Sequence, residues 1–184
     1  MVDQRQPWVA FFRNLNLGHA GSPTRGQLEA AFAEAGATAA RSFRTNGTVL
    51  FSAAHPAATL ADAHARLASV GYADAVFLRS VDELRAAEGG GLFPEPRPVD
   101  VYRQCYTFVD APLPDGLTPP WAATQGDLDL HAVHGLIVLS SIRRRGTGVG
   151  NPTAVIERAG GGPATTRTRG TVQALVAVAE GWRP

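Results

Sequence analysis

Arginine is the residue type in this chain whose number and positions point most directly to chemistry. The chain has 17 residues of the Lys+Arg class, and every one of them is arginine. Without lysine, Schiff-base catalysis and a P-loop lysine are excluded, and a bound anion must be held by guanidinium groups. Several arginines stand where a strand is expected to end or a loop to begin: Arg13, Arg143, Arg144, Arg145, Arg167 and Arg169. We predict that these side chains bind phosphate or carboxylate oxygens.

A glycine-rich stretch directly follows three of these arginines. It reads Gly146-Thr147-Gly148-Val149-Gly150 and precedes a helix expected over residues 152–158. Free backbone N–H groups in such a loop, with the positive end of a helix dipole, can cradle anionic oxygens, which adds Gly146, Gly148 and Gly150 to the predicted site. The stretch lacks the Gly-Lys-Ser/Thr ending of a P-loop. A second interpretation stays open, in which the arginines form a solvated rim and the glycines a turn.

Arg13 and Asn16 follow the first expected strand and complete the predicted set. A charged side chain directly after a buried strand either has a partner that pins it or faces a cleft. Asn14 and Asn16 could instead satisfy the backbone of a turn through their side chains. In the predicted site Arg13 and Asn16 orient the ligand, residues 143–145 supply charge, and the glycine amides hold its oxygens.

Other kinds of reactive site find little support in the residue pattern. His131 and His134 are three positions apart around an expected hairpin turn, and no carboxylate cluster accompanies them, so no metal and no cofactor is predicted. The single cysteine, Cys105, excludes an internal disulfide and falls inside an expected strand, where it is typical of a small apolar filler. No Gly-x-Ser-x-Gly motif names a catalytic residue, so the sequence leaves open whether the protein is an enzyme.

The composition is typical of one large domain or two small ones. The chain has 184 residues, 45% of them apolar, and a net charge of +1, which gives no overall field toward nucleic acid or membrane. No apolar run approaches the roughly 18 residues that a membrane span needs, and the N-terminus lacks the apolar stretch of a signal peptide. We therefore expect a cytoplasmic protein that makes no membrane contact.

The first half of the chain has the element order of a split βαβ, or ferredoxin-like, unit. Thr24 and Gln27 have the spacing of a capping box at a helix start, and Asn46-Gly47 between two apolar runs indicates a hairpin. The expected elements are a strand at 8–12, a helix closed by Gly36, strands at 40–44 and 48–52, a helix from Pro56 to Gly71, a strand at 75–78, and a short helix from Ser80 to the glycines at 89–91.

The same order repeats after a linker that is rich in glycine and proline. The expected elements are a strand at 102–109, a poor helix at 112–121, strands at 128–132 and 136–139, a helix at 152–158, a strand at 164–167 and a helix at 171–180. We therefore predict an α+β protein of two duplicated ferredoxin-like (βαββαβ) subdomains, residues 1–88 and 101–184, joined by a Gly/Pro linker at 89–100. A helix-free apolar sheet face is unfavourable in water, so the two sheets are expected to pack together, with cover by a partner protein as the alternative.

RNA binding is a rival hypothesis, because RNA-recognition modules share this topology. The segment that begins at Phe11 resembles their first-strand motif. The third-strand positions that should carry base-stacking rings are Asn46 and Thr48, however. With no net basic charge as well, the sequence argues against nucleic acid as a partner.

Three short segments carry a family resemblance. They are Arg13 to Gly18 after the first strand, Thr45 to Phe51 in the hairpin, and Ala164 to Val172 before the last helix. They are similar to the Arg-Gly-Ile-Asn-Val-Gly, Gln-Ser-Gly-Asn-Val-Val-Phe and Thr-Arg-Asn-Trp-Asn-Thr-Val motifs of a bacterial family, domain of unknown function 1697 (DUF1697). The resemblance implies paired ferredoxin-like subdomains and brings no established reaction. The chain departs from the family at 168–170, where members have Asn-Trp-Asn, and at 148–150, where members place a lysine or serine.

The leading hypothesis is therefore a protein from a family of unknown function that binds a small anionic ligand through arginines and a glycine-rich loop. A non-catalytic protein–protein interaction module is the first alternative, and RNA binding on a ferredoxin-like sheet is the second. The sequence leaves open the identity of the ligand, the reaction class, and the choice between monomer and homodimer.

Overall fold

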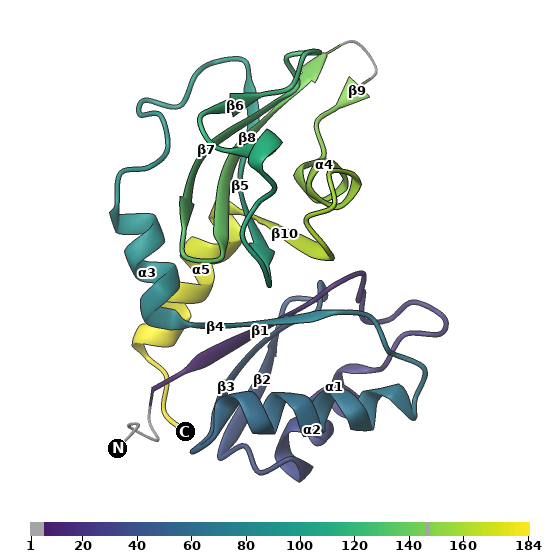
Figure 1. Cartoon of the computed structure of the whole chain (residues 1–184). Helices are drawn as coiled ribbons and strands as arrows, with labels where there is room; N and C mark the ends of the chain where they lie inside the picture. Colours follow the sequence, from purple (N-terminus) through teal and green to yellow (C-terminus); the bar gives the residue numbers. More distant parts are fainter. Residues whose placement is uncertain (1–5, 146–147) are drawn as a thin grey trace. The chain divides into compact units, whose positions relative to one another are not determined.

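The chain divides into two compact units in this computed structural model, which describes residues 6–145 and 148–184 (Figure 1). The first unit comprises Met1–Leu84 and Leu175–Pro184, and the second comprises Arg85–Ala174. The described residues form a mixed α+β fold with two antiparallel sheets and five α-helices, which confirms the α+β part of the predicted fold class. None of these helices has the length and apolar character that crossing a membrane requires.

The first unit contains a four-stranded sheet with two helices on one of its faces (Figure 1). Its strand order is β2-β3-β1-β4, and each neighbouring pair is antiparallel. The elements are β1 (Trp8–Phe12), α1 (Arg25–Glu34), β2 (Ala39–Phe43), β3 (Thr48–Ser52), α2 (Pro56–Ala68) and β4 (Val76–Ser80), after which α3 (Val81–Gly89) leads into the second unit. The element order predicted for this half of the chain is confirmed.

Two local sequence signals act as predicted. Thr24 and Gln27 form a reciprocal capping box: the Thr24 hydroxyl accepts from the Gln27 N–H at 3.2 Å, and Gln27 Oε1 accepts from the Thr24 N–H at 2.8 Å. In the hairpin, Gly47 has φ +63°, and a Cβ there would lie 2.7 Å from the Cβ of Leu15. Only glycine fits this turn without strain, because both the left-handed backbone and the close approach exclude a side chain.

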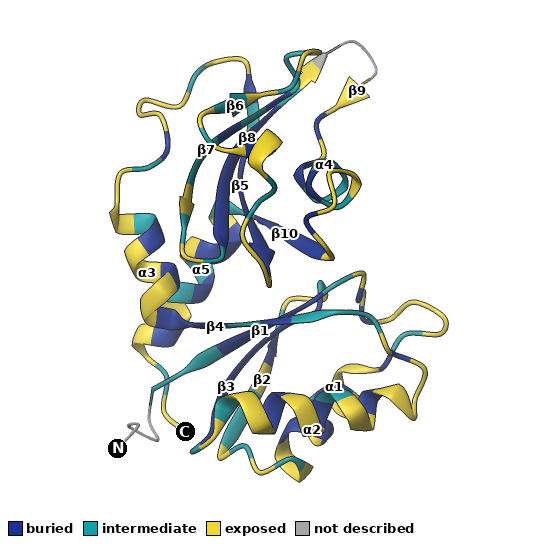
Figure 2. Ribbon diagram, viewed as in Figure 1, coloured by how far each residue is buried: buried dark blue, intermediate teal, exposed yellow. Residues whose placement is uncertain are grey.

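The core of the first unit lies between the sheet and its helices. Phe12 points into it and makes edge-to-face contacts with Phe32 and Tyr72, at centroid distances of 6.2 and 5.5 Å. The outward sides of α1 and α2 are exposed, while the sides that pack on the sheet are buried (Figure 2). The largest buried members of this core are Phe12, Leu28, Phe32, Phe51 and Leu67.

Strand β2 lies at one edge of this sheet, and two side chains of α1 cover part of its free edge. Glu29 Oε1 accepts from the backbone N–H of Ser42 at 2.8 Å. Arg25 donates to the carbonyl oxygens of Ser42 and Arg44, at 3.0 and 3.1 Å. Backbone groups that face no neighbouring strand are therefore hydrogen-bonded within the unit.

The second unit is built on a longer sheet with the strand order β10-β5-β8-β7-β6, in which β9 also pairs with β8. Its elements are β5 (Val101–Val109), the 3₁₀-helix η1 (Asp115–Leu117), β6 (Trp121–Ala122), β7 (Leu128–His134), β8 (Ile137–Arg145), β9 (Gly148–Val149), α4 (Pro152–Arg158), β10 (Ala164–Thr168) and α5 (Arg169–Glu180). One core of this unit combines buried residues of the sheet with η1 and α4, and its members include Val109, Leu117, Leu128, Val138 and Ile156.

The proline-rich segment 112–121 agrees with the expectation of no more than a poor, short helix. It holds the single 3₁₀ turn η1 and the start of β6, because its four prolines lack N–H donors and clash with an α-helical backbone. The strand expected at 136–139 is longer than predicted: β8 runs to Arg145 and pairs with β9, so Arg143, Arg144 and Arg145 form the end of a strand.

Candidate functional site

The arginine after the first strand is held by a carboxylate. Arg13 Nη1 donates to both oxygens of Asp74, at 3.0 and 2.8 Å, and Asn14 Nδ2 donates to the same carboxylate at 2.9 Å. Burial raises the pKa of Asp74, but hydrogen bonds from the Ala75 N–H, Arg13 and Asn14 outweigh it and leave the pKa lowered. Asn16 is exposed, and its carbonyl accepts from the His19 N–H at 3.4 Å. Of the two interpretations of Arg13, the structure therefore shows a pinned side chain.

Two arginines of the second unit, Arg143 and Arg167, also form ion pairs or hydrogen bonds with nearby residues. Arg143 Nε donates to Asp100 at 2.8 Å, and its Nη1 donates to Asp129. Arg167 is 8% exposed and donates to the Thr165 hydroxyl at 2.9 Å and the Thr166 carbonyl at 3.0 Å. These contacts hold strands and loops of the unit together.

The glycine-rich stretch is described from Gly148 onward. Gly146 lies outside the described residues, and so does the side chain of Arg145. Gly148 pairs with Arg145 through the backbone in the short strand β9. Gly150 packs so closely on the carbonyl of Asp127 that a Cβ would lie 2.3 Å from that oxygen. Close backbone approach is therefore one physical reason for glycine at position 150.

Another set of cationic side chains gathers at the start of α5, in a depression of about 380 Å³ that we call the α5 pocket. The segment before β5 contributes Glu95 and Arg97, and β5 contributes Tyr102 and Arg103. The first turns of α5 contribute Arg169, with Gly170 and Gln173 beside it. Among the predicted arginines whose side chains the structure describes, Arg169 alone lines this pocket.

Arg144, which was also predicted from the sequence, contacts the ring of the pocket residue Tyr102. The guanidinium carbon of Arg144 lies 3.9 Å from the centre of the Tyr102 ring, and that of Arg103 lies 4.6 Å from it. Arg103 also donates to the phenolic oxygen at 2.9 Å. The hydrogen bond from Arg144 and the charges of both arginines outweigh desolvation and lower the pKa of Tyr102. Throughout residues 6–145 and 148–184, no carboxylate forms an ion pair with Arg97, Arg103 or Arg144.

Arg169 is fixed on one side by the carboxylate of Glu88. Its Nε and Nη2 donate to Glu88 Oε1 at 2.9 and 2.7 Å. Tyr106 donates its hydroxyl to the other oxygen of the same carboxylate, and Gln173 Nε2 donates to Oε1 at 2.9 Å. We call these four residues the Glu88 cluster. The guanidinium carbon of Arg169 also lies 4.8 Å from the centre of the Phe93 ring.

These contacts set the charge states of the cluster. Burial raises the pKa of Glu88, but hydrogen bonds from Arg169, Tyr106 and Gln173 outweigh it, so the pKa lies below its ordinary value of 4.5. The bond to Glu88 raises the pKa of Arg169. Burial, together with the bond and the charge of Glu88, raises the pKa of Tyr106. Glu88 and Arg169 are therefore an ion pair at neutral pH, and Tyr106 is protonated.

Because the pKa of Glu88 is lower in the folded protein than in the unfolded chain, its stabilising effect is lost as the pH falls. The contribution is fully present above about pH 5 and decreases as the solution becomes more acidic than pH 4.5. We expect the difference in free energy of unfolding between the wild type and Glu88→Gln to shrink between about pH 5 and pH 3. Urea denaturation of both proteins at four pH values measures this difference in stability. A difference that does not change with pH would contradict the lowered pKa of Glu88.

The surroundings of His131 and Cys105 do not favour a reactive role for either side chain. His131 Nε2 lies 2.7 Å from the hydroxyl oxygen of Ser141, but Ser141 is fully buried and out of reach of a substrate. Burial raises the pKa of Cys105 to about 12, so its sulfur is a thiol at neutral pH. No three His, Cys, Asp or Glu side chains of the described residues are placed to hold a metal ion.

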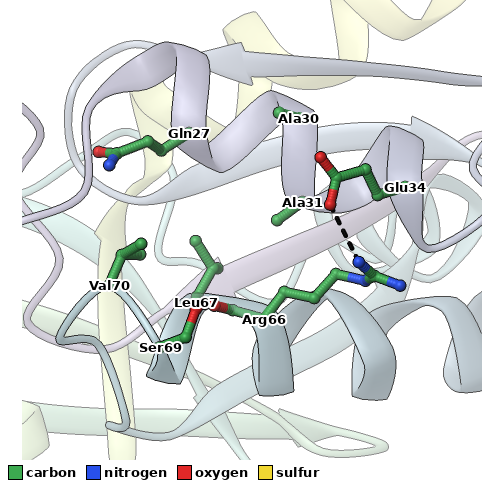
Figure 3. A pocket seen from close by; sticks show the side chains of 8 residues that line it. All are labelled: Gln27, Ala30, Ala31, Glu34, Arg66, Leu67, Ser69 and Val70. Carbon is green, nitrogen blue, oxygen red and sulfur yellow. Dashed lines mark hydrogen bonds and ion pairs between the residues drawn. The ribbon is translucent and has the colours of Figure 1, made fainter.

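A further depression, of about 250 Å³, lies between α1 and α2 of the first unit (Figure 3). Across it, Arg66 Nη1 donates to Glu34 Oε2 at 2.9 Å. Apolar side chains that include Leu67 and Val70 line much of the remainder, together with Gln27 and Ser69. Since its arginine is already paired, this groove offers less to an anion than the α5 pocket does.

Sequence reasoning missed Arg97, Tyr102 and Arg103. Arg97 stands in a segment with three prolines, which the sequence indicates only as a linker, and the other two begin a strand that was assigned no chemistry. A signal in the sequence is that Arg103 lies near the start of an expected strand and Arg169 just before an expected helix. The two line one pocket because β5 pairs with β10, whose last residue, Thr168, lies opposite Cys105.

Comparison with known proteins is consistent with the resemblance seen in the sequence. The sequence model of DUF1697, a protein of unknown function, matches residues 6–135. Two of the three resembling segments lie inside that range, and the segment at 164–172 lies beyond it. No curated protein matches the sequence significantly.

Among solved structures, the conserved bacterial protein SP0830 from Streptococcus pneumoniae is similar to the chain. The two share 15% sequence identity with a TM-score of 0.61, over 95% of this chain and 98% of that chain. At this identity the likeness shows a shared fold alone. Because the family model matches well over half of the 184 residues, the chain belongs to the DUF1697 family of proteins of unknown function.

Proposed function

We propose that the protein binds a small anionic ligand in the α5 pocket, with Arg97 and Arg103 as its main contacts. The observation that supports this most is that Arg97 and Arg103 line the α5 pocket and have no carboxylate as an ion-pair partner among the described residues. Guanidinium groups bind carboxylate and phosphate oxygens through paired N–H donors, and in a pocket such bonds are stronger than on an open surface.

The surroundings of the two arginines favour an anion as well. Helix α5 begins in the pocket, and its first N–H groups carry a partial positive charge. Gly170, in its first turn, has no neighbouring atom within 4 Å of where a Cβ would stand, so a ligand atom can approach the backbone there. The volume of about 380 Å³ suits a metabolite of modest size rather than a polymer.

The proposed ligand belongs to the class predicted from the sequence, but the proposed binding site is the α5 pocket rather than the glycine-rich stretch at 146–150. Two arginines predicted from the sequence are still part of the proposed site. Arg144 lies beside Tyr102, and Arg169 lines the pocket. Arg13, Arg143 and Arg167 are assigned to structural roles, because each has partners of its own.

Arg103→Gln is expected to weaken the binding of an anionic probe by about tenfold, since a hydrogen bond to a charged group contributes roughly 1.5–3 kcal/mol. The probes are inorganic phosphate, pyrophosphate and citrate, tested at constant ionic strength. At a hundred times its Kd, a probe should stabilise the wild type by about 2.7 kcal/mol, which corresponds to a rise in Tm of about 5–10 °C for a chain of this size. Thermal shift followed by calorimetric titration measures both effects.

Arg158→Gln is the matched control for this experiment. It removes one positive charge from the same unit, but Arg158 lines a separate depression and donates to the carbonyl of Ala154 in its own helix. Equal binding by the wild type and Arg103→Gln would contradict the site. No stabilisation by any probe, combined with a dimer in solution, would favour the alternative of a protein–protein interaction module.

We also propose that the chain is a duplication of two ferredoxin-like subdomains, residues 1–88 and 101–184, with a linker at 89–100. The order β2-β3-β1-β4 of the first sheet has a counterpart in β7-β8-β5-β10 of the second. The second copy would have lost its first helix to the proline-rich segment and gained β6 at its edge.

A further inference from the structure

One carboxylate projects into the otherwise cationic α5 pocket, and it comes from the chain itself. Glu95 is the sole acidic residue among the described side chains that line the pocket. One of its oxygens accepts a hydrogen bond from Nη1 of Arg169, and its side chain is 56% exposed. It lies between Pro94 and Pro96 in the segment that joins α3 to β5.

Arg169 does not need Glu95 to keep its position. Its Nε and Nη2 donate to Glu88, its guanidinium carbon lies 4.8 Å from the centre of the Phe93 ring, and Nη1 also donates to Gln104 Oε1 at 2.8 Å. Nη1 carries two N–H donors, of which one serves Gln104 and the other serves Glu95. If Glu95 leaves, a rigidly held donor stays aimed at the place that a carboxylate oxygen occupied.

We infer that Glu95 stands in for a carboxylate of the ligand, and that the α5 pocket takes an organic anion with two or more carboxylates. This inference rests on the proposed function and names its ligand class. One ligand carboxylate replaces Glu95 on Arg169, and a second is bound by Arg97 and Arg103. A monocarboxylate makes only one of these contacts, and binds more weakly.

The exchange is favourable because the contact that breaks is the more exposed of the two ion pairs that Arg169 forms with described residues. Glu88 holds the guanidinium with a fork of charged hydrogen bonds, whereas the more exposed Glu95 makes a single contact, of the kind that contributes a factor of about two to five. The two carboxylates of the ligand are linked covalently, so the second contact is made at a high effective concentration.

The test compares citrate with acetate, and the wild type with Glu95→Gln, by calorimetric titration at constant ionic strength. Citrate is expected to bind at least tenfold more tightly than acetate. Glu95→Gln is expected to bind citrate about three- to fivefold more tightly than the wild type, because the internal competitor has lost its charge. Asp115→Asn is the matched control: it removes the same charge from η1, outside the pocket, and should leave the Kd for citrate unchanged.

Hydrogen exchange of the wild type gives a second readout that a general effect of charge would not produce. Citrate is expected to accelerate exchange of the amides at Glu95, Arg97 and Val99, which alternate with prolines that have none, because release of Glu95 frees the segment that carries it. Slower exchange there, or equal Kd values for Glu95→Gln and Asp115→Asn, would overturn the inference. Either of these results would leave the proposed function intact, provided that Arg103→Gln still weakens binding.

The remaining outcomes are equally decisive. Binding of phosphate but not of citrate would overturn the inference about ligand class and leave anion binding standing. Failure of both the wild type and Glu95→Gln to bind any of the probes would overturn the inference and the proposed function together.

Discussion

Arg169→Met is expected to lower the free energy of unfolding by about 2–3 kcal/mol. Methionine retains the length of the side chain but leaves the carboxylate of Glu88 without a cation, and Glu88 is only 22% exposed in its side chain. Removing one partner of a buried ion pair costs roughly 3–5 kcal/mol, and the partial exposure of this pair places the effect at or below the lower end of that range. Urea denaturation followed by tryptophan fluorescence measures the change.

A double-mutant cycle separates the pair from the other contacts of Arg169. Arg169→Met combined with Glu88→Gln should be less destabilising than the sum of the single changes, because the second substitution removes the charge that the first leaves unpaired. Arg66→Met is the control, since Arg66 forms exposed ion pairs with Glu34 and Asp62 and should cost less than about 1 kcal/mol. Equal losses for Arg169→Met and Arg66→Met would show that the Glu88 cluster does not stabilise the fold.

Gly150→Ala is expected to destabilise the second unit by about 3 kcal/mol or more. The added Cβ would meet the carbonyl oxygen of Asp127 at 2.3 Å, its carbon at 2.9 Å and the Cβ of Leu128 at 3.1 Å. Two of these atoms belong to the backbone, so relief requires the segment before β7 to move, and overpacking of this kind costs roughly 1–3 kcal/mol or more. The carbonyl of Asp127 also accepts from the N–H of Arg143 at 2.8 Å, a bond that the movement would strain.

Gly116→Ala is the matched control for that substitution. Gly116 lies in η1 of the same unit, and no atom stands within 4 Å of where its Cβ would be. Its replacement should change the free energy of unfolding by less than about 1 kcal/mol. If Gly150→Ala is as stable as Gly116→Ala, the packing explanation fails, and a role for Gly150 in ligand binding becomes the better account.

Local signals in the sequence predict much of the fold. Thr24 and Gln27 cap α1 as their spacing predicts, and Gly47 takes the left-handed turn that Asn-Gly between apolar runs indicates. Such features depend on residues a few positions apart, so sequence spacing alone is sufficient. The segment 112–121 shows the limit, because its prolines exclude a helix without indicating that residues 121 and 122 pair with β7.

The candidate site is less predictable because its contacts join distant segments. The sequence singles out Arg169 but not Glu88, which lies 81 positions earlier and fixes its guanidinium group. Arg143 and Arg103 look alike in the sequence. Only the structure shows that two aspartates hold the first while the second has no carboxylate partner among the described residues. A charged residue can be recognised from sequence, whereas whether its charge is already neutralised depends on tertiary packing.

The side chains along β2 have a consequence for how the protein behaves at high concentration. A bare outer strand is a template onto which another polypeptide can add, and repeated addition leads to aggregates. Glu29 and Arg25 occupy the donor and acceptor groups of Ser42 that an incoming chain would use, and they place two charges in its path. Helix α1 thus hinders the addition of a strand at the β2 edge, in the same unit whose hydrophobic core it helps to close.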